Sequence, residues 1–243
     1  MSVLSVLGFL VIWEAIYQLE WVNPMFLSSP LVIIKALYRL MTTGDLFEHL
    51  YLTLSHFTLG FVLSAVGGVI VGLILGWYRV LGEASDPFLT AMIGTPRIVL
   101  LPLITLWFGV GLLSKVIIVF IAAFFPIIIN TMSGVRSLDQ NHLRVAHAFG
   151  ANSLQIFLTV ALPGSIPHIV SGLRVGIGQA LVAVVAAEMF VSTGGIGYFV
   201  AQSSANFNVN YVFVGIVTVV FLGLFITWLV RLLERRFESW RPE

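Results

Sequence analysis

Long apolar runs separated by short polar segments constrain this chain more than any other feature. Of its 243 residues, 59% are hydrophobic and only 9% are charged, and the mean hydropathy is +1.04. A soluble domain carries about a quarter of its residues as charged side chains, whereas a membrane-crossing helix needs about 20 consecutive apolar residues. The runs are continuous and not alternating, which favours helices over barrel strands. We therefore predict an all-α polytopic membrane protein.

The apolar runs predict about six transmembrane helices within a single transmembrane domain, residues 1–243. The expected spans are residues 3–17, 53–77, two within 88–131, 168–191 and 211–233. Residues 133–163 form a long polar loop between the fourth and fifth spans. A Gly/Ser/Asn-rich connection at 192–210 is expected to hold a short re-entrant or interfacial helix. Apolar residues at helical spacing over 31–41 predict a short helix lying at the membrane surface.

Glycines and polar clusters mark where these runs pack or break. Gly68, Gly72 and Gly76 recur at every fourth position, a pattern that lets another helix approach closely. The run over 88–131 is too long for one span, and its expected break lies at 109–115. The polar residues of 79–87 are expected to form a short loop.

Basic residues predict the orientation, because Lys and Arg concentrate on the cytoplasmic side of a membrane. Six spans divide most of these residues eight against three, which places the 133–163 loop and both termini in the cytoplasm and the 192–210 connection outside. The eight are Arg79, Arg136, Arg144, Arg174, Arg231, Arg235, Arg236 and Arg241, and the three are Lys35, Arg39 and Lys115.

The cytoplasmic loop carries signals for two short helices joined at an angle. Ser137 followed by Gln140 has the form of a capping box, which predicts a helix ending near residue 149. Gly150 can adopt the left-handed conformation that ends a helix. Asn152 can cap a second helix that Pro163 is expected to stop. The apolar residues expected to project from the loop as a knob for a groove on a partner are Leu143, Phe149, Leu154, Phe157 and Leu158.

The order of residues over 144–163 resembles the coupling loop of permeases from ATP-binding-cassette (ABC) importers. The chain reads R-V-A-x₃-G-x₉-V-x-L-P, and the family reads E-A-A-x₃-G-x₉-I-x-L-P. Arg144 stands where the family usually has a glutamate, which leaves the partner's contact at that point open. The resemblance implies that an ATPase docks on this loop. The residues that it places there are Leu143, Arg144, Ala146, Phe149, Gly150, Leu154, Leu162 and Pro163.

Five further segments, in the same order, resemble the nitrate/sulfonate/taurine group of these permeases. They are Phe26–Pro30, Pro102–Gly109, Ser171–Gly176, Ala187–Glu188 and Gly194–Tyr198. The resemblance implies a type I ABC-importer permease fold in an inner membrane and a homodimer of this chain. It also implies two ABC ATPase subunits and an external solute-binding protein. ATP and Mg would belong to the ATPase, with no cofactor bound by this chain.

Polar residues inside spans are the candidates for the translocation pathway, because a charge in the bilayer is costly unless it is paired or faces water. Glu188 shares the fifth span with Gly172, Gly176 and Gln179, and Arg97 lies in or near the third. The competing interpretation makes Glu188 a structural carboxylate that fixes helix packing, neutral or paired with a residue such as Arg97.

The sequence lacks the residue patterns typical of thiol chemistry, ATP binding, metal binding and nucleic-acid binding. There is no cysteine and no G-x₄-G-K-[ST] loop, the histidines do not have metal-binding spacing, and the net charge of +1 gives no sign of nucleic-acid binding. An ion-coupled secondary transporter or channel is the alternative from another class, although the inverted repeats it predicts are not evident. The favoured cargo is a nitrate-, sulfonate- or taurine-like anion, with a pyrimidine precursor or riboflavin-like heterocycle as the alternative.

Overall fold

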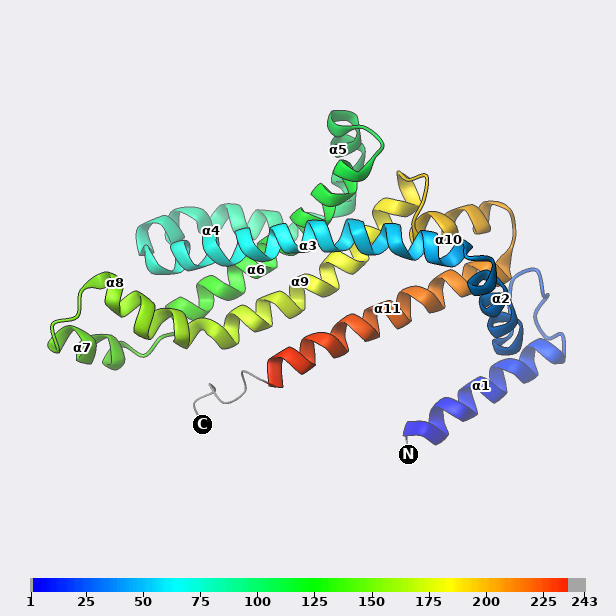
Figure 1. Cartoon of the computed structure of the whole chain (residues 1–243), viewed down its shortest axis with the longest axis horizontal. Helices are drawn as coiled ribbons and strands as arrows, with labels where there is room; N and C mark the ends of the chain where they lie inside the picture. The colour runs from blue at the N-terminus through cyan, green and yellow to red at the C-terminus, as the bar shows by residue number, and fades with distance from the viewer. Residues whose placement is uncertain (1, 236–243) are drawn as a thin grey trace. The chain divides into compact units, whose positions relative to one another are not determined.

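The computed structural model of the chain describes residues 2–235, and every regular element in that range is a helix (Figure 1). The described residues form two compact units, one from 2–55 and 185–222 and the other from 56–184 and 223–235. The C-terminal arginines Arg236 and Arg241, counted above for the orientation, lie outside the described residues. The helices are α1 (Ser2–Gln18), α2 (Pro30–Thr43), α3 (Asp45–Trp77), α4 (Arg79–Gly94), η1 (Arg97–Leu100), α5 (Leu101–Phe108), α6 (Leu112–Arg136), α7 (Gln140–Ala148), α8 (Ser153–Ile156), η2 (Phe157–Ala161), α9 (Leu162–Phe190), α10 (Ile196–Ala205) and α11 (Val209–Arg235).

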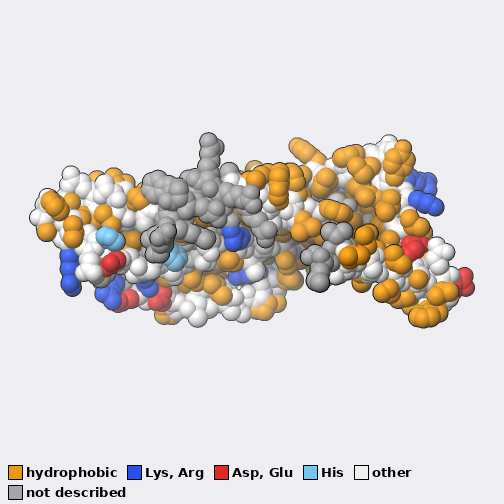
Figure 2. Space-filling view, turned by 90° about the horizontal axis from the view of Figure 1, so that it is seen from below, with side chains coloured by type: hydrophobic (Ala, Val, Ile, Leu, Met, Phe, Trp, Pro, Cys, Tyr) orange, Lys and Arg blue, Asp and Glu red, His pale blue; other side chains and the backbone are white. Residues whose placement is uncertain are grey.

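Four stretches of helix are long and apolar enough to cross a membrane: α3, α6, the continuous helix Ser153–Phe190, and Val209–Val230 of α11. They confirm helices at four of the expected spans. The first expected span forms the shorter apolar helix α1. Hydrophobic side chains cover much of the face shown in Figure 2, and many large ones, such as Leu106 and Phe88, are exposed. A lipid-facing surface has this character, because hydrocarbon replaces water as the solvent.

The third expected span is not one straight helix. Arg79–Gly94 and Arg97–Phe108 meet at 90°. Pro96 disfavours helical backbone at the residue before it, and Thr95 is accordingly extended, with ψ 124°. The loop expected at 79–87 is also wrong, because these residues form the first turns of α4, where Arg79 and Glu83 are an i, i+4 ion pair at 3.3 Å.

The helix break expected within 109–115 is found at residues 109–111, between α5 and α6. Gly109 ends α5 with a φ of +76°, and Gly111 is the N-cap of α6. Lys115, expected in an external polar break, instead lies in the first turns of α6 and is buried.

The Phe26–Pro30 segment provides the N-cap and the first residue of α2. The Ser29 side chain caps the helix by accepting a hydrogen bond from Val32 N at 3.2 Å, and Pro30 occupies the first helical position. Ser28 is fully buried and donates to Asn210 Oδ1 at 2.6 Å, while its carbonyl accepts from Trp13 Nε1 at 2.8 Å. The predicted helix over 31–41 is confirmed. Its inner face buries Ile33 and Leu40 within a cluster that includes Ile196 and Val214.

The glycine stripe of α3 packs directly against α6. A Cβ added at Gly68 would lie 2.9 Å from Ile127 Cγ2, and one added at Gly72 would lie 2.6 Å from Thr131 Cβ. At Gly76 the same atom would lie 2.7 Å from Val135 Cβ. The backbones are therefore closer than any larger residue would permit, and the predicted role of the stripe is confirmed.

Substitution of Gly72 by alanine is expected to destabilise the protein, because the added methyl group meets both Thr131 Cβ and Ile128 O within 2.8 Å. Overpacking of this kind costs about 1–3 kcal/mol, equivalent to about 2–10 °C in melting temperature. Thermal unfolding of the full chain in detergent micelles measures the change. Gly178→Ala is the matched control, because nothing lies within 4 Å of a Cβ at that position. Equal melting temperatures for the two variants would contradict the close α3–α6 contact.

Candidate functional site

The polar loop after α6 begins with a capped helix. Asp139 precedes α7, and its carboxylate accepts a hydrogen bond from Asn141 N at 2.8 Å. The capping box expected from Ser137 is wrong, because α6 continues to Arg136 and Ser137 is its C-cap, donating to Gly134 O at 3.0 Å. The helix therefore begins at Gln140 with Asp139 as its N-cap, two residues later than the sequence pattern predicts.

Gly150 ends α7 as predicted. Its φ is +76°, in the left-handed region that side chains disfavour. Its N–H bonds to His147 O at 2.9 Å, and the following Ala151 N bonds to Ala146 O at 3.1 Å. This pair of hydrogen bonds is the Schellman motif, which satisfies the last carbonyls of a helix and turns the chain away from it.

The second short helix is confirmed at its start and corrected at its end. Asn152 and Gln155 form reciprocal capping bonds of 2.8 and 2.9 Å. Pro163 does not stop the helix, because α8 continues through the π-helical turn η2 directly into α9. In η2, Leu162 N donates to Phe157 O five residues back. Pro163 follows this π-helical turn directly and lies inside the continuous helix.

Three residues of the expected apolar knob are exposed, whereas Phe157 packs the loop against α3. Phe149 is 88% exposed, Leu154 66% and Leu158 51%. Leu143, Ala146, Leu162 and Pro163 are half-buried, and Arg144 is exposed. Phe157 instead packs against Trp77 at the end of α3, with ring centroids 5.3 Å apart and planes at 70°. The protruding part of the knob is therefore Phe149, Leu154 and Leu158.

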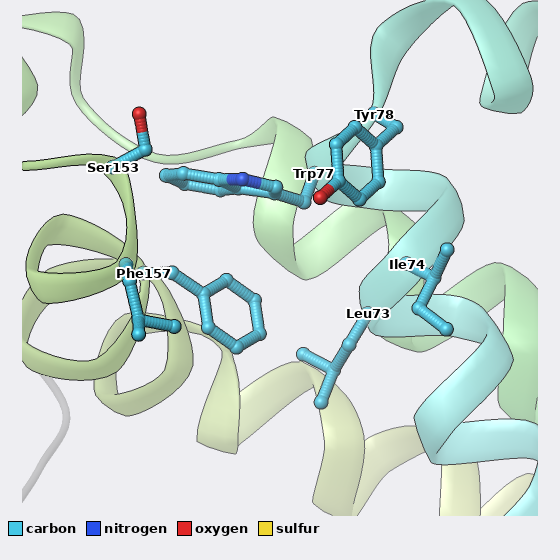
Figure 3. Close-up of a pocket in the computed structure, with 7 residues that line it drawn as sticks. Leu73, Ile74, Trp77, Tyr78, Ser153 and Phe157 are labelled. Atoms are coloured by element: carbon cyan, nitrogen blue, oxygen red, sulfur yellow. The ribbon is translucent and has the colours of Figure 1, made fainter.

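A groove of about 370 Å³ lies between the end of α3 and α8. Figure 3 shows the Trp77 indole above the Phe157 ring, with Tyr78 to the right of both. Its lining is mostly apolar and consists of Leu73, Ile74, Trp77, Tyr78, Ser153, Leu154 and Phe157. Leu154 thus forms part of the groove wall and remains 66% exposed.

Contacts that the sequence did not predict hold the base of the loop. Arg136, at the end of α6, forms an ion pair with Asp86 of α4 at 3.5 Å. A Cβ at Gly82 would collide with the backbone carbonyl of Leu75 as well as with the Arg136 guanidinium, so glycine is required at this position. Ser137 Oγ lies 3.3 Å from Nε2 of His168 in α9. The loop is therefore tied to both α4 and α9, and no local sequence signal links residues so far apart in the chain.

Glu188 forms the second polar cluster and is fully buried. Thr53 Oγ1 donates to Glu188 Oε2 at 2.8 Å, and Gly197 N donates to the same oxygen at 3.0 Å. Ile196 N donates to Thr53 Oγ1 at 2.8 Å, and Gly195 N to His49 Nδ1 at 3.2 Å. The helix α10 has no side-chain cap of its own. Its orphan N–H groups are therefore satisfied by residues of α3 and α9.

The Gly194–Tyr198 segment is glycine-rich because the backbone passes against Glu188. Gly195 has a φ of +103°, and a Cβ there would overlap the Glu188 carboxylate. A Cβ at Gly197 would lie 2.8 Å from Glu188 Cβ and overlap Val185 O. This arrangement supports the interpretation of Glu188 as a structural carboxylate that fixes packing.

The pathway candidates of the other compact unit divide into two groups. Arg97 Nη1 donates to Gln179 Oε1 at 2.8 Å, so the structure brings these two together; Gln179 takes the place of the acidic partner suggested for Arg97. Gly172 and Gly176 are buried against α6, with Cβ positions 2.8 Å from Asn130 Cβ and 3.0 Å from Ile127 Cδ1. Their pathway role stays a prediction.

The arrangement of capped loop helices on a bundle of apolar helices has a counterpart in a known family. Residues 68–239 match the family described as the binding-protein-dependent transport system inner membrane component. The match covers most of the chain, including the whole loop. The chain therefore belongs to this family and is a multi-pass transport subunit of an ABC importer, as the resemblance implied; the ion-coupled alternative is not favoured.

Individual relatives agree with this assignment. The chain is 34% identical to the aliphatic sulfonates transport permease protein SsuC of Bacillus subtilis, over 95% of this chain and 83% of that protein. It is 29% identical to the taurine transport system permease protein TauC of Escherichia coli, over 96% and 87%. Its fold is similar to a chain of the inward-facing MetNI methionine ABC transporter, with a TM-score of 0.67, 19% identity and coverage of 83% and 98%.

Replacing Gly150 by valine is expected to loosen the end of α7, since a side chain in left-handed backbone costs about 1–2 kcal/mol. Amide hydrogen exchange of residues 143–149 should become faster by about 5- to 30-fold. Ala148→Val, in ordinary helical backbone of the same turn, is the matched control. Unchanged exchange in Gly150→Val would contradict the Schellman assignment.

Replacing Glu188 by leucine is expected to destabilise the chain more than replacing it by glutamine. Leucine leaves the donors of Thr53 and Gly197 without their acceptor, at about 1–3 kcal/mol each. Glutamine can present an oxygen to both. Thermal unfolding in detergent micelles compares the two variants, and a leucine variant as stable as the glutamine variant would contradict the capping role.

Proposed function

We propose that two copies of this chain form the translocation pathway of an ATP-driven importer. Two ABC ATPase subunits would dock on the cytoplasmic loops, and a solute-binding protein would deliver cargo from outside. The observation that carries the proposal is the loop over 133–163. It presents Phe149 and Leu154 to solvent on two capped helices that are held to the bundle at Arg136 and Phe157.

The charge distribution supports a cytoplasmic position for this loop. The face bearing this loop carries Arg79, Arg136 and Arg144, which favours the cytoplasm. Both termini would then also be cytoplasmic, and the α10 segment external. ATP and Mg would bind the ATPase alone, because the chain lacks a phosphate-binding loop.

The mechanism is alternating access. Closure of the ATPases on ATP would draw the two loops together. Movement of the loop would be passed on to the fifth span, because residues 153–190 form one continuous helix. Its displacement would therefore tilt that helix and switch the bundle between two packings, one open to each side.

The cargo that we propose is a small sulfonate-like anion, as the names of the SsuC and TauC relatives suggest. A pyrimidine precursor is the second candidate. It is favoured by 31% identity to the formylaminopyrimidine transport permease protein ThiX of Halalkalibacterium halodurans, over 96% of this chain.

Truncation of the exposed knob is expected to release the ATPase. Phe149→Ala and Leu154→Ala each remove a large apolar side chain that is mostly exposed in the isolated chain. Loss of an interface anchor costs about 2 kcal/mol or more, which weakens binding about 30-fold. Co-purification of tagged permease with the ATPase from the native host, followed by mass spectrometry, measures the loss.

The control is His147→Ala, because His147 is an exposed residue of α7, two positions before Phe149. It should retain the ATPase. If wild-type permease is recovered alone even after crosslinking, the importer proposal fails. If the Phe149 and Leu154 variants retain the ATPase fully, the docking surface lies elsewhere.

A further inference from the structure

Arg97 lies where an apolar segment changes direction. It is the first residue of η1, directly after Thr95–Pro96, in the 90° bend between Arg79–Gly94 and Arg97–Phe108. The residues around the bend are apolar, and Ile98 and Val99 are exposed. A charged side chain at such a position is costly, so it indicates a function and calls for a partner.

The partner that the structure provides is an amide and not an acid. Arg97 Nη1 donates to Gln179 Oε1 at 2.8 Å. Arginine can only donate, so the oxygen of Gln179 must face it. The NH₂ group of Gln179 is then left to donate elsewhere, and the Gln179 side chain is exposed. The pair therefore presents donors, with its one acceptor already occupied.

The charge of Arg97 has no compensating carboxylate within the described part of the chain. By contrast, Arg79 is paired with Glu83 and Arg136 with Asp86. Arg97 Nε is buried and meets no acceptor among the described residues. An uncompensated guanidinium in an apolar setting attracts an anion strongly, because the low dielectric weakens screening.

The surface next to the pair is open and smooth. Nothing lies within 4 Å of a Cβ at Gly178, and Val182, one turn further along α9, is 64% exposed. Donors from two directions beside an open apolar wall suit a small molecule with an oxyanion head and a short apolar tail. Guanidinium groups bind such heads with two parallel hydrogen bonds.

We propose that Arg97 and Gln179 together bind the oxyanion group of the transported solute within the membrane. The inference rests on the proposed function and deepens it, because anion selection then occurs in the permease as well as in the external binding protein. Arg97 supplies the positive charge. Gln179 orients the Arg97 side chain through its oxygen and adds its NH₂ group as a neutral donor.

The test uses the importer complex, permease with its ATPases, in proteoliposomes with the binding protein outside. Uptake of radiolabelled taurine, an alkanesulfonate and nitrate is measured per ATP hydrolysed. Arg97→Gln should lower this ratio about tenfold, the effect of one lost charge-assisted contact. Arg97→Lys should retain most of it, and Gln179→Leu should be intermediate. The control is Arg79→Gln, whose wild-type side chain is 89% exposed.

Several outcomes would overturn the inference. Wild-type uptake per ATP in Arg97→Gln would do so, as would equal losses in Arg97→Gln and Arg97→Lys, which would assign Arg97 to packing. An effect that disappears in liposomes without anionic lipid would assign it to a lipid headgroup. If the wild-type complex hydrolyses ATP but accumulates none of these anions, the oxyanion site is wrong, although the chain can still belong to an importer. If the permease binds no ATPase, the proposed function itself is wrong.

Discussion

The absence of water from the bilayer interior is the constraint on which the structure depends, because every backbone N–H and C=O there must find a partner within the protein. Long helices meet this demand along their length but leave it open at their ends. The start of α10 is accordingly closed by Thr53, Glu188 and His49 from other helices. Polar side chains from the interior of α3 and the end of α9 thus serve the start of a third helix.

Local signals predicted the parts of the fold that depend on neighbouring residues. The four long spans, the break at Gly109 and the glycine stripe of α3 follow from length, glycine placement and periodicity. Local signals do not predict the helix over 79–87, because its charged residues and Pro87 are equally typical of a loop. In the structure Arg79 and Glu83 pair along one helical face, so charge at this position supports a helix.

The candidate sites divide in the same way. Gly150 and Asn152 were predicted correctly because capping is a matter of a few adjacent residues. The bond between Arg97 and Gln179 joins residues 82 apart, and that between Thr53 and Glu188 joins residues 135 apart. No pattern in a single sequence specifies such pairs. Local sequence predicts that the helix ends at Pro163, whereas in the structure it continues past this residue, directly after the π-helical turn Phe157–Ala161.

The passage from α8 through η2 into α9 gives the chain a mechanical property. At 1.5 Å per residue, the 38 residues of Ser153–Phe190 form a rod about 57 Å long. A tilt of a few degrees at one end of such a rod displaces the other end by several ångströms. The π-helical turn at Phe157–Ala161 interrupts the regular α-helical hydrogen-bond pattern of this rod. Stiffness along most of the length and compliance at that turn together set how much of an applied force reaches the far side of the bilayer.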